Sequence, residues 1–391
     1  MGTQKPLTVS TRSQQIAERA RQFPDEGLRT LHHYIDQTWL HEAYDRTRKD
    51  GAVGIDGVDA ATYAEDLTSN LLDLENRMKS GRYVAPHGKR AYVPKGKHGK
   101  RPISINCFED KVAQRAVAMV YEPIFEEEFM DCSYGFRPHR SPHDALNKLF
   151  QQIQSMGGCW LLDADVESYF DKVNKQHLRD MVRSRVRDGV LDRLLGKWLH
   201  AGVMDDGLVT YPESGVPQGG VISPILSNIY LHYVLDEWFV KHVQPRLSGR
   251  AFMIRFADDF VMGFAEERDA RRVLEVLPKR VGRYDLRLHP EKTRLLHFVP
   301  PERGDPTTSF DFLGFTHRWE RSRKGRWVVR QSTKKASMCK ALAKIWETCR
   351  THRHMSLKEQ CQDLNRRLNG HYQYFGITGN HPNVYRFYRR V

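Results

Sequence analysis

The sequence predicts an α+β protein with a largely antiparallel sheet, followed by a basic C-terminal region made of helices. Strand-like and helix-like stretches alternate through the middle of the chain without the strict rhythm of strand-helix-strand units. After Phe315 the pattern changes to amphipathic helices with few acidic residues. The chain has 391 residues, 40% of them hydrophobic, which is enough for two or three domains with substantial cores.

The N-terminal part predicts a helical extension and then a longer helix. Residues 1 to about 50 are polar, with helical spacing around Leu28 to Ile35, and lead into the glycine-punctuated stretch GAVGIDGVD from Gly51 to Asp59. The amphipathic run from Ala60 to Lys79 is followed by Ser80 and Gly81, a sequence typical of a helix end.

A basic hairpin and a long helix are expected next. Two short arms around Tyr92 and Ile103 flank the turn sequence PKGKHGK, which predicts a β-hairpin with a positively charged tip. Residues Glu109 to Phe129 carry apolar side chains at helical spacing. Ser141 and Pro142 then form an N-cap and a first-turn proline for a further helix.

The middle of the chain predicts the strands that hold the acidic residues. Residues 160–166 read as a strand, and the segment 251–264, AFMIRFADDFVMGF, reads as a hairpin with its turn at Ala257 to Asp259. Ser223 and Pro224 open a helix between them. A helix over 266–284 and a strand over 293–298 follow the hairpin.

The positive charge is concentrated at the C-terminal end. The whole chain carries 62 Lys and Arg against 48 Asp and Glu, a net charge of +14. From Thr316 to Val391 there are 18 basic residues against 4 acidic ones, so this region accounts for the whole excess. Helices are expected around Met338 and around Leu357, the second with a capping box at Ser356 and Glu359. This distribution predicts a polyanionic partner for the C-terminal region.

Cysteine usage and hydropathy indicate a soluble, cytoplasmic protein. The six cysteines show no CxxC pairing and no clustered histidines, which argues against zinc fingers and favours reduced thiols. The first residues lack the apolar stretch of a signal peptide, and no run approaches the ~20 apolar residues of a membrane span.

Two acidic clusters indicate a metal-dependent site. Asp165 ends the first strand, and the adjacent pair Asp258 and Asp259 lies at the turn of the hairpin. Either cluster alone is more simply an acidic turn, but both together in a basic protein favour convergence on divalent cations. Mg²⁺ fits, because it prefers hard oxygen ligands and keeps part of its water shell for substrate phosphates. Two such ions serve phosphoryl transfer.

A glycine-rich loop before a helix adds a second indication. Residues 214–231, SGVPQGGVISPILSNIYL, place glycines on both sides of Pro217 and Gln218. Glycine lets the backbone approach a ligand closely, and a helix N-terminus favours anionic groups. Gln218 is therefore a candidate contact to a nucleotide or a template.

These motifs resemble those of reverse transcriptases. RFADDF resembles the family's catalytic hairpin, DVESYFD its first acidic motif, and the glycine-rich string its second block. The resemblance implies a right-hand polymerase with fingers, a palm that contains the antiparallel sheet, and an all-α thumb. It also implies that Asp165, Asp258 and Asp259 bind two Mg²⁺ ions, for which Mn²⁺ can substitute, with the Val166 carbonyl as a further ligand. Phe256 stands where many relatives have tyrosine.

The same resemblance implies roles for residues around the reacting groups. Lys95 and Arg101 would grip the triphosphate, since a guanidinium binds phosphate through two hydrogen bonds. Phe170 falls at the position that excludes a 2′-hydroxyl, and Lys292, in LHPEKTRLL, lies where a leaving pyrophosphate is protonated. FDFLGF matches the primer grip, with Leu313 and Gly314 near the primer end.

Several further strings are similar to those of bacterial reverse transcriptases encoded by group II introns or descended from them: GAVGIDGVD, RPISI, SYGFRPHRS and FLGF. The implied domains are an extension over 1–58, fingers over 59–160, a palm over 161–315 and a basic helical thumb or maturase-like region over 316–391. The implied partners are an RNA template, a DNA or RNA primer, dNTPs and structured intron RNA. Candidate nucleic-acid contacts near the C-terminus are Arg366, Arg367, Tyr372, Tyr374 and Arg386.

Two alternatives remain beside an intron-encoded polymerase. One is a non-catalytic maturase that folds an intron and keeps the polymerase body as a scaffold. The other is a domesticated enzyme of phage defence or DNA repair. The intact acidic triad argues against pure scaffolding, because an unused cluster of like charges needs compensation. The chain is expected to end within the last thumb helix, without a nuclease segment.

Overall fold

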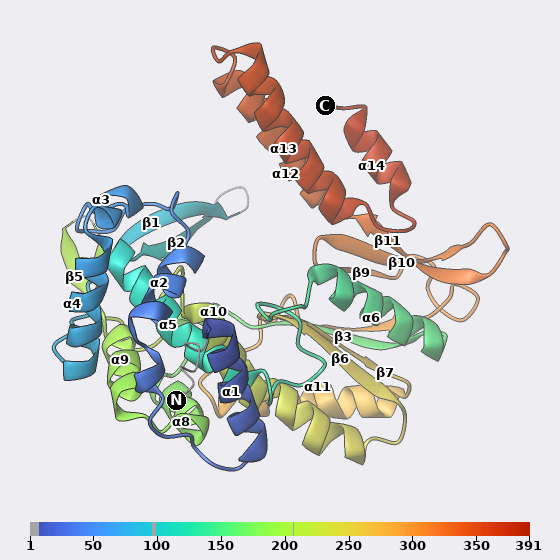
Figure 1. Cartoon of the computed structure of the whole chain (residues 1–391). Helices are drawn as coiled ribbons and strands as arrows, with labels where there is room; N and C mark the ends of the chain where they lie inside the picture. Colours follow the sequence, from blue (N-terminus) through green and yellow to red (C-terminus); the bar gives the residue numbers. More distant parts are fainter. Residues whose placement is uncertain (1–7, 96–98, 206) are drawn as a thin grey trace, which may run out of the picture. The chain divides into compact units, whose positions relative to one another are not determined.

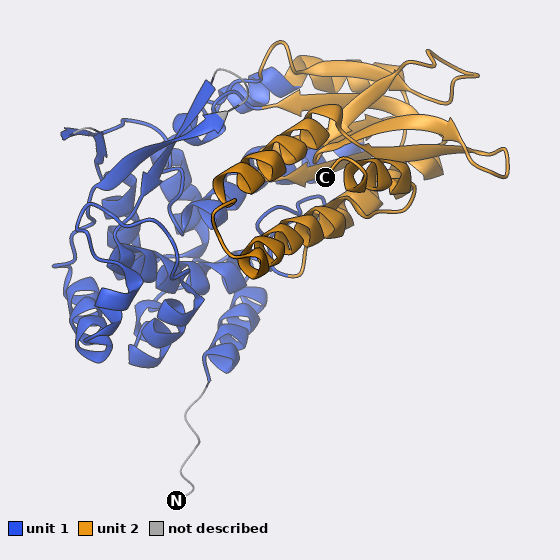
Figure 2. Ribbon diagram, turned by 90° about the horizontal axis from the view of Figure 1, so that it is seen from above, with its two compact units in different colours: residues 1–138, 166–245, 277–288 blue, residues 139–165, 246–276, 289–391 orange. Residues whose placement is uncertain are grey.

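The computed structural model describes residues 8–95, 99–205 and 207–391, which form two compact units (Figure 2). Unit 1 contains residues up to Pro138 together with Val166–Pro245 and Leu277–Leu288. Unit 2 contains His139–Asp165, Arg246–Val276 and His289–Val391. The chain therefore passes between the units several times, and the division into four sequential domains stays a prediction.

Unit 1 is mainly helical and contains one mixed four-stranded sheet in the order β2-β1-β4-β5 (Figure 1). The helices of its first segment are α1 (Val9–Gln22), α2 (Gln37–Arg46), α3 (Ala60–Ala64), α4 (Leu67–Ser80) and α5 (Phe108–Phe125). The strands are β1 (Gly88–Lys95), β2 (Gly99–Ile105), β4 (Val203–Asp205) and β5 (Leu208–Thr210). The later helices are α7 (Tyr169–Lys172), α8 (Lys175–Arg185), α9 (Gly189–Leu199) and α10 (Ser223–Leu231), the last continued by π-helical turns to Val243.

Unit 2 contains two antiparallel sheets. The larger has the order β6-β7-β3-β8, and the smaller has the order β11-β10-β9. Its strands are β3 (Cys159–Asp165), β6 (Ala251–Phe256), β7 (Asp259–Phe264), β8 (Arg294–Phe298), β9 (Ser309–Phe312), β10 (Phe315–Arg321) and β11 (Trp327–Thr333). Its helices are α6 (Pro142–Met156), α12 (Lys335–Thr351), α13 (Leu357–Phe375) and α14 (His381–Tyr388). Helix α11 (Glu267–Gly282) crosses the boundary between the units.

The local stop and start signals act as predicted. Gly81 adopts a left-handed φ of 82° at the end of α4, a conformation that glycine takes without a steric penalty. Ser141 caps α6 in a full capping box with Asp144, and Ser356 does the same for α13 with Glu359. These caps confirm the predicted ends of three helices.

Three expectations about helices were wrong. The single helix expected from Ala60 to Lys79 is divided into α3 and α4 at Glu65 and Asp66. The spacing around Leu28 to Ile35 forms only a 3-10 turn at His32–Tyr34, with α1 and α2 on either side of it. The helical region expected from Thr316 begins only at Lys335, because residues 315–333 form the β10–β11 hairpin. In β10 every second side chain is buried, namely Phe315, His317 and Trp319. This alternation is typical of a strand, and it decides the structure here although the basic composition had suggested a helix.

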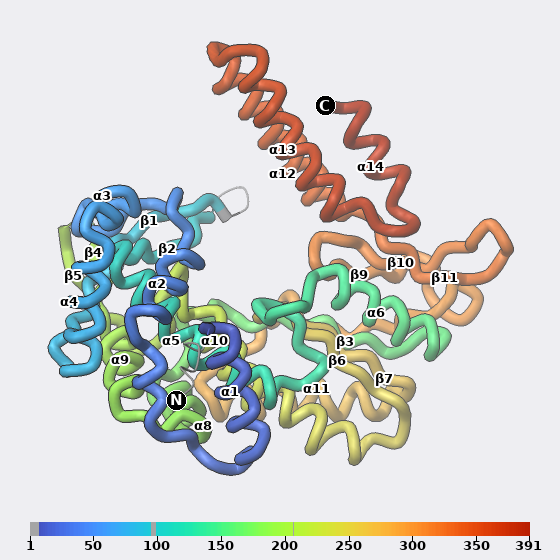
Figure 3. Tube along the Cα trace, viewed as in Figure 1, coloured from blue at the N-terminus to red at the C-terminus, as the bar shows by residue number. Residues whose placement is uncertain are grey.

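The three C-terminal helices pack on one another through a small core. Helices α12 and α13 run side by side and α14 follows them in the trace (Figure 3). Met338, Ile345 and Phe387 are the buried centre of this cluster. Among the helices in the described part of the chain, none is long and apolar enough to cross a membrane.

Candidate active site

The two acidic motifs meet on one sheet of unit 2. Asp165, the last residue of β3, pairs directly with Asp259, the first residue of β7. In an antiparallel pair, opposite residues place their side chains on the same face. Asp258 precedes Asp259 in the two-residue turn between β6 and β7, where Phe256 pairs with Asp259. The predicted convergence of the two strands is confirmed.

The turn that carries Asp258 is held from inside the sheet by an arginine. Ala257 has a left-handed φ of 57°, which costs a residue with a side chain roughly 1 to 2 kcal/mol. Arg255 on β6 is fully buried, and its Nη1 donates a hydrogen bond of 2.9 Å to the Ala257 carbonyl. A buried charge is retained only when it is well paired, so Arg255 fixes the conformation of the turn.

Negative charge accumulates around Asp259. Burial raises the pKa of Asp259 to about 7, and the carboxylates of Asp163, Asp258 and Asp165 contribute to the rise, while Lys334 opposes them. Two neighbouring carboxylates have cationic partners: Asp165 pairs with Lys292, and Asp163 pairs with Arg294 at 3.1 Å. Asp259 therefore has an excess of negative neighbours.

This donor set suits a hard divalent cation, although the ligands are not gathered into a finished site. No group of three or more carboxylate, imidazole or thiol side chains within the described ranges is close enough to hold one ion. The ammonium of Lys292 neutralises Asp165, and a lysine whose side chain is 55% exposed can leave that carboxylate without unfolding. Carboxylate oxygens with excess negative charge fit Mg²⁺.

The backbone after Asp165 is anchored on both sides. The Asp165 carbonyl accepts a hydrogen bond of 2.8 Å from the His289 amide. Val166 is buried and bridges Leu288. The role of the Val166 carbonyl as a metal ligand stays a prediction.

In unit 1 the structure brings Phe170 against the glycine-rich loop. The Val216 amide donates to the Phe170 carbonyl at 2.8 Å. Gly215 has a φ of 95°, and a Cβ added there would lie 2.9 Å from the same carbonyl oxygen. Only glycine allows this approach, which explains the first glycine of the motif.

The other side of the loop is joined to the basic hairpin. The Ser104 amide of β2 donates to the Gln218 carbonyl at 2.6 Å. Gly219, with a φ of 103°, would place a Cβ 2.6 Å from the Ser104 carbonyl oxygen. Arg101 lies three residues earlier on β2 and is exposed. The Lys95 backbone closes β1, but its side chain lies outside the described part of the structure.

The predicted primer grip is a tight turn between β9 and β10. Leu313 and Gly314 have positive φ values of 49° and 79°, and Phe312 pairs with Phe315 across the turn. The Tyr374 hydroxyl of α13 donates to the Leu313 carbonyl at 2.9 Å. Tyr374 thus ties the turn to the C-terminal helices.

The remaining predicted nucleic-acid contacts differ in exposure. Arg366 and Arg386 are exposed, and Arg386 donates to Asn383 at 3.2 Å. Arg367 is partly buried and pairs with Asp363 at 3.0 Å. Tyr372 packs against the core of the C-terminal helices. The two exposed arginines are therefore the better placed of these to meet a polyanion.

Sequence reasoning missed the charged residues that support the site from within. Arg255 could have been found, because a single arginine interrupts the apolar strand AFMIRF. Asp163 lies two residues before Asp165 and so faces the same side of β3. Asp110 on α5 is fully buried in unit 1, and no short motif marks it.

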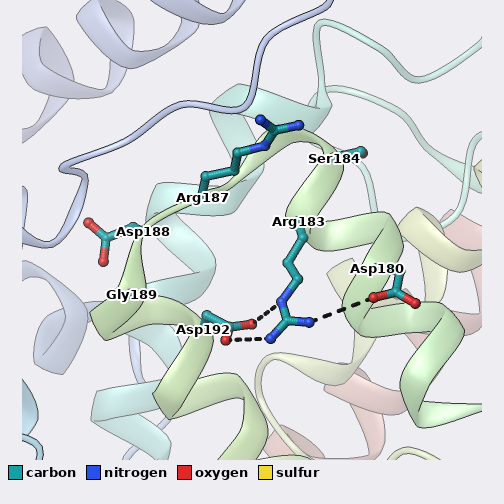
Figure 4. Close-up of a pocket in the computed structure, with 7 residues that line it drawn as sticks. All are labelled: Asp180, Arg183, Ser184, Arg187, Asp188, Gly189 and Asp192. Atoms are coloured by element: carbon teal, nitrogen blue, oxygen red, sulfur yellow. Dashed lines mark hydrogen bonds and ion pairs between the residues drawn. The ribbon is translucent and has the colours of Figure 1, made fainter.

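A separate hollow in unit 1 lies between α8 and α9 (Figure 4). Burial opposes ionisation of Asp192, yet hydrogen bonds from Arg179 and Arg183 outweigh it and lower the pKa of Asp192 to about 2. Asp188 caps α9 and also accepts the amides of Leu31 and His32. None of the predicted site residues lines this hollow, which is better explained as a structural ion-pair cluster.

Comparisons with known proteins identify a family. Residues 93–317 match the family described as "Reverse transcriptase (RNA-dependent DNA polymerase)". Protein YkfC of Escherichia coli (strain K12) is 34% identical over 365 residues, which cover 83% of this chain and 92% of that protein. The group II intron-encoded protein LtrA of Lactococcus lactis subsp. cremoris is 30% identical over 233 residues, covering 58% of this chain and 38% of that protein. Nuclear intron maturase 4, mitochondrial, of Arabidopsis thaliana is 27% identical over 211 residues, covering 54% of this chain and 24% of that protein.

Proposed function

The chain belongs to the reverse transcriptase family, in its group II intron branch, and on this basis we propose that its acidic strand ends join dNTPs to a primer along an RNA template. The primer 3′-oxygen bonds to the α-phosphorus of the dNTP, the bond to the β-phosphate oxygen breaks, and pyrophosphate leaves. The chain spans only 38% of the length of LtrA. The polymerase activity is therefore proposed for this protein and is not carried over from LtrA.

The observation that carries this proposal is the pairing of Asp165 with Asp259 on adjacent strands. A two-residue turn adds Asp258. Burial raises the pKa of Asp259 to about 7, and the neighbouring carboxylates contribute to the rise. We assign Asp165, Asp258, Asp259 and the Val166 carbonyl as the ligands of Mg²⁺. Two bound Mg²⁺ ions would supply Lewis-acid stabilisation of the phosphates and lower the pKa of the 3′-hydroxyl.

The other predicted residues receive roles in binding and orientation. Lys292 is long and exposed enough to leave Asp165 and donate a proton to the departing pyrophosphate. Arg101 and Lys95 bind the triphosphate, and Gln218 orients the nucleotide. Phe170 stands beside the sugar and excludes a 2′-hydroxyl. These roles follow the family resemblance, and the joined backbone of β2, the glycine loop and α7 supports them.

The layout proposed for these parts is that of a right hand. Residues 59–160 are assigned to the fingers, 161–315 to the palm and 316–391 to the thumb, after an extension over 1–58. The antiparallel sheet that carries the carboxylates supports the palm assignment. The packed helices α12 to α14 support the thumb assignment, with the β10–β11 hairpin preceding them.

Primer extension tests the proposal. Wild-type protein, given a DNA primer on an RNA template with Mg²⁺ and dNTPs, is expected to extend the primer. Asp258→Asn and Asp259→Asn should each reduce extension by more than about 100-fold, since even residues that only support metal ligands cost 10- to 100-fold. Asp50→Asn is the matched control, because the Asp50 side chain is 75% exposed on a loop. Undiminished synthesis by Asp258→Asn would refute the assignment.

Binding of structured intron RNA is a second proposed role, favoured by the exposed arginines of α13 and α14 and by the named maturase among the relatives. The affinity for a group II intron RNA should fall with salt. Arg366→Gln together with Arg386→Gln should reduce the slope of log affinity against log salt by about 1.4 to 1.8, which corresponds to one phosphate contact for each arginine in a single strand or in a duplex. Arg271→Gln, an exposed arginine of α11, serves as the control. An unchanged slope would remove these two residues from the RNA contact.

A further inference from the structure

Asp110 is a carboxylate enclosed by four hydrogen-bond donors inside unit 1. Its side chain lies on α5, and the residue is 1% exposed. Oδ1 accepts from the Tyr83 hydroxyl and from Trp198 Nε1, the latter at 2.8 Å. Oδ2 accepts from Asn106 Nδ2 at 2.6 Å and from Gln114 Nε2 at 2.8 Å. Two donors on each oxygen satisfy a carboxylate that burial alone would destabilise.

Two of these donors lead to the glycine loop. Gln114 uses its amide nitrogen on Asp110, and its Oε1 accepts the Ile222 backbone amide at 3.3 Å. A Cβ on Gly220 would lie 3.2 Å from the same oxygen, so the loop passes directly over Gln114. The far end of the loop is therefore held in place by the orientation of one side-chain amide.

The near side of the loop is connected to Asp110 through β2. Asn106 lies two residues after Ser104, whose amide donates to the Gln218 carbonyl at 2.6 Å. The loop also closes on itself, because Ser223 Oγ donates to the Pro217 carbonyl at 2.8 Å. Gln218 thus lies in a short loop that is linked to Asp110 on both sides, through Gln114 and through the Asn106–Ser104 segment.

We propose that Asp110 and Gln114 are positioning residues for nucleotide binding, which set the Gln218 loop through a relay of hydrogen bonds with one fixed polarity. The inference rests on the proposed function of Gln218 and adds the buried residues that hold it. Donors point to Asp110, and the acceptor of Gln114 points to Ile222.

The polarity of the relay predicts a specific failure. Asp110→Asn keeps the shape but replaces one acceptor oxygen with a donor. If that donor faces Gln114, the glutamine must turn its amide over to accept, and its Nε2 then opposes the Ile222 amide. Two donors would face each other, so the loop is expected to shift. A buried donor left without an acceptor raises the free energy of the folded state, so the loop is expected to move rather than keep the two donors opposed.

A second substitution should restore the polarity. In Asp110→Asn combined with Gln114→Glu, the amide introduced at position 110 donates to one oxygen of the carboxylate introduced at position 114. The other oxygen of that carboxylate accepts from the Ile222 amide. Asn106 can turn its own amide over to accept, because its Oδ1 has no hydrogen-bond partner in the described structure. The double variant also keeps a single negative charge in the network.

The measurement is steady-state primer extension at pH 8, with the dNTP KM, kcat and primer-template affinity determined separately. Asp110→Asn is expected to raise the dNTP KM about tenfold with little change in primer-template affinity, within the range of coupling between residues that share a network. The double variant should return the KM to within about threefold of wild type. Asp269→Asn, another buried aspartate that accepts two backbone amides, is the matched control and should leave the KM unchanged.

The outcomes separate this inference from the proposed function. If wild-type protein does not extend a primer, the proposed function fails. If wild type is active and the double variant shows no recovery of KM relative to Asp110→Asn, the relay is overturned. Should Asp110→Asn fail to fold, Gln114→Met removes the acceptor for Ile222 while leaving three donors on Asp110. An unchanged dNTP KM in folded Gln114→Met would equally overturn the inference.

Discussion

Asp165 at the end of β3 lies opposite Asp259 at the start of β7, and Lys292 forms an ion pair with Asp165 on the same unit. Two carboxylates placed side by side repel each other, and the ammonium relieves part of that repulsion. The pairing therefore couples a proposed metal ligand to a proposed proton donor.

Replacing Lys292 with Met should separate these two roles. Without the ammonium, Asp165 binds a cation with less competition, so the Mg²⁺ concentration for half-maximal primer extension should fall severalfold. The maximal rate should fall as well, because a proton donor in this reaction class contributes roughly 100-fold or more. A Mg²⁺ titration of extension rate measures both quantities. Lys241→Met, an exposed lysine paired with Glu237, is the control. A rise in the Mg²⁺ requirement would contradict the competition.

Phe170→Ala is expected to admit ribonucleotides. The Phe170 carbonyl accepts a hydrogen bond from the Val216 amide, so the backbone of Phe170 is held against the glycine loop. Removing the ring should leave dNTP incorporation largely intact. The ratio of rNTP to dNTP incorporation should rise by about tenfold or more, because relief of a steric clash worth about 1.4 kcal/mol corresponds to a factor of ten. Competition between the two nucleotides in one reaction measures the ratio. Tyr169, its neighbour, is buried against Ser227 and should not alter sugar choice when changed to Phe. If rNTP use does not rise, the gate assignment is wrong.

Gly219→Ala should weaken nucleotide binding and destabilise unit 1. The added Cβ would lie 2.6 Å from the Ser104 carbonyl oxygen, and the φ of 103° is unfavourable for alanine. The strain is expected to cost roughly 1 to 3 kcal/mol and to raise the dNTP KM. Thermal unfolding and steady-state kinetics check the two effects. Gly189→Ala is the matched control, because a Cβ there meets nothing within 4 Å. Equal behaviour of the two variants would contradict the close approach of the loop to β2.

Acid should destabilise the protein through His317. Burial lowers the pKa of this histidine to about 4, whereas an unfolded histidine titrates near 6.5. The unfolded chain therefore binds the proton first, and this contribution to stability is complete above pH 6.5 and falls as the pH drops toward 4. At pH 5 the loss should be about 2 kcal/mol. Unfolding midpoints at pH 7.5 and pH 5 measure it.

His317→Gln is the control for this titration. The ring of His317 stacks on Phe310, with ring centroids 4.6 Å apart, so the variant should be less stable than wild type at pH 7.5. Its stability should nevertheless change less than that of wild type between pH 7.5 and pH 5. An equal change in both proteins would assign the acid sensitivity to other groups.

The sequence by itself determined the features that a few neighbouring residues encode. Ser141 with Asp144, Ser356 with Glu359 and Gly81 set helix ends through contacts within one turn. The turn at Ala257 and Asp258 was equally readable, because an acidic pair interrupts alternating apolar residues. The proposed catalytic carboxylates could be named for the same reason, since each marks the end of an apolar strand.

Only the tertiary structure decided which distant groups face each other. The register that places Asp165 opposite Asp259 joins residues from separate strands, and Asp110 accepts hydrogen bonds from Tyr83 and Trp198, which lie far from it in the sequence. The β10–β11 hairpin was also missed, because the strongly basic composition of this stretch favoured helices in the sequence analysis. Its alternating burial becomes visible only in the structure. A buried charge is tolerated only when packing supplies its partners. A local pattern can indicate that a charged residue such as Arg255 is buried, but it cannot identify partners that come from distant parts of the chain.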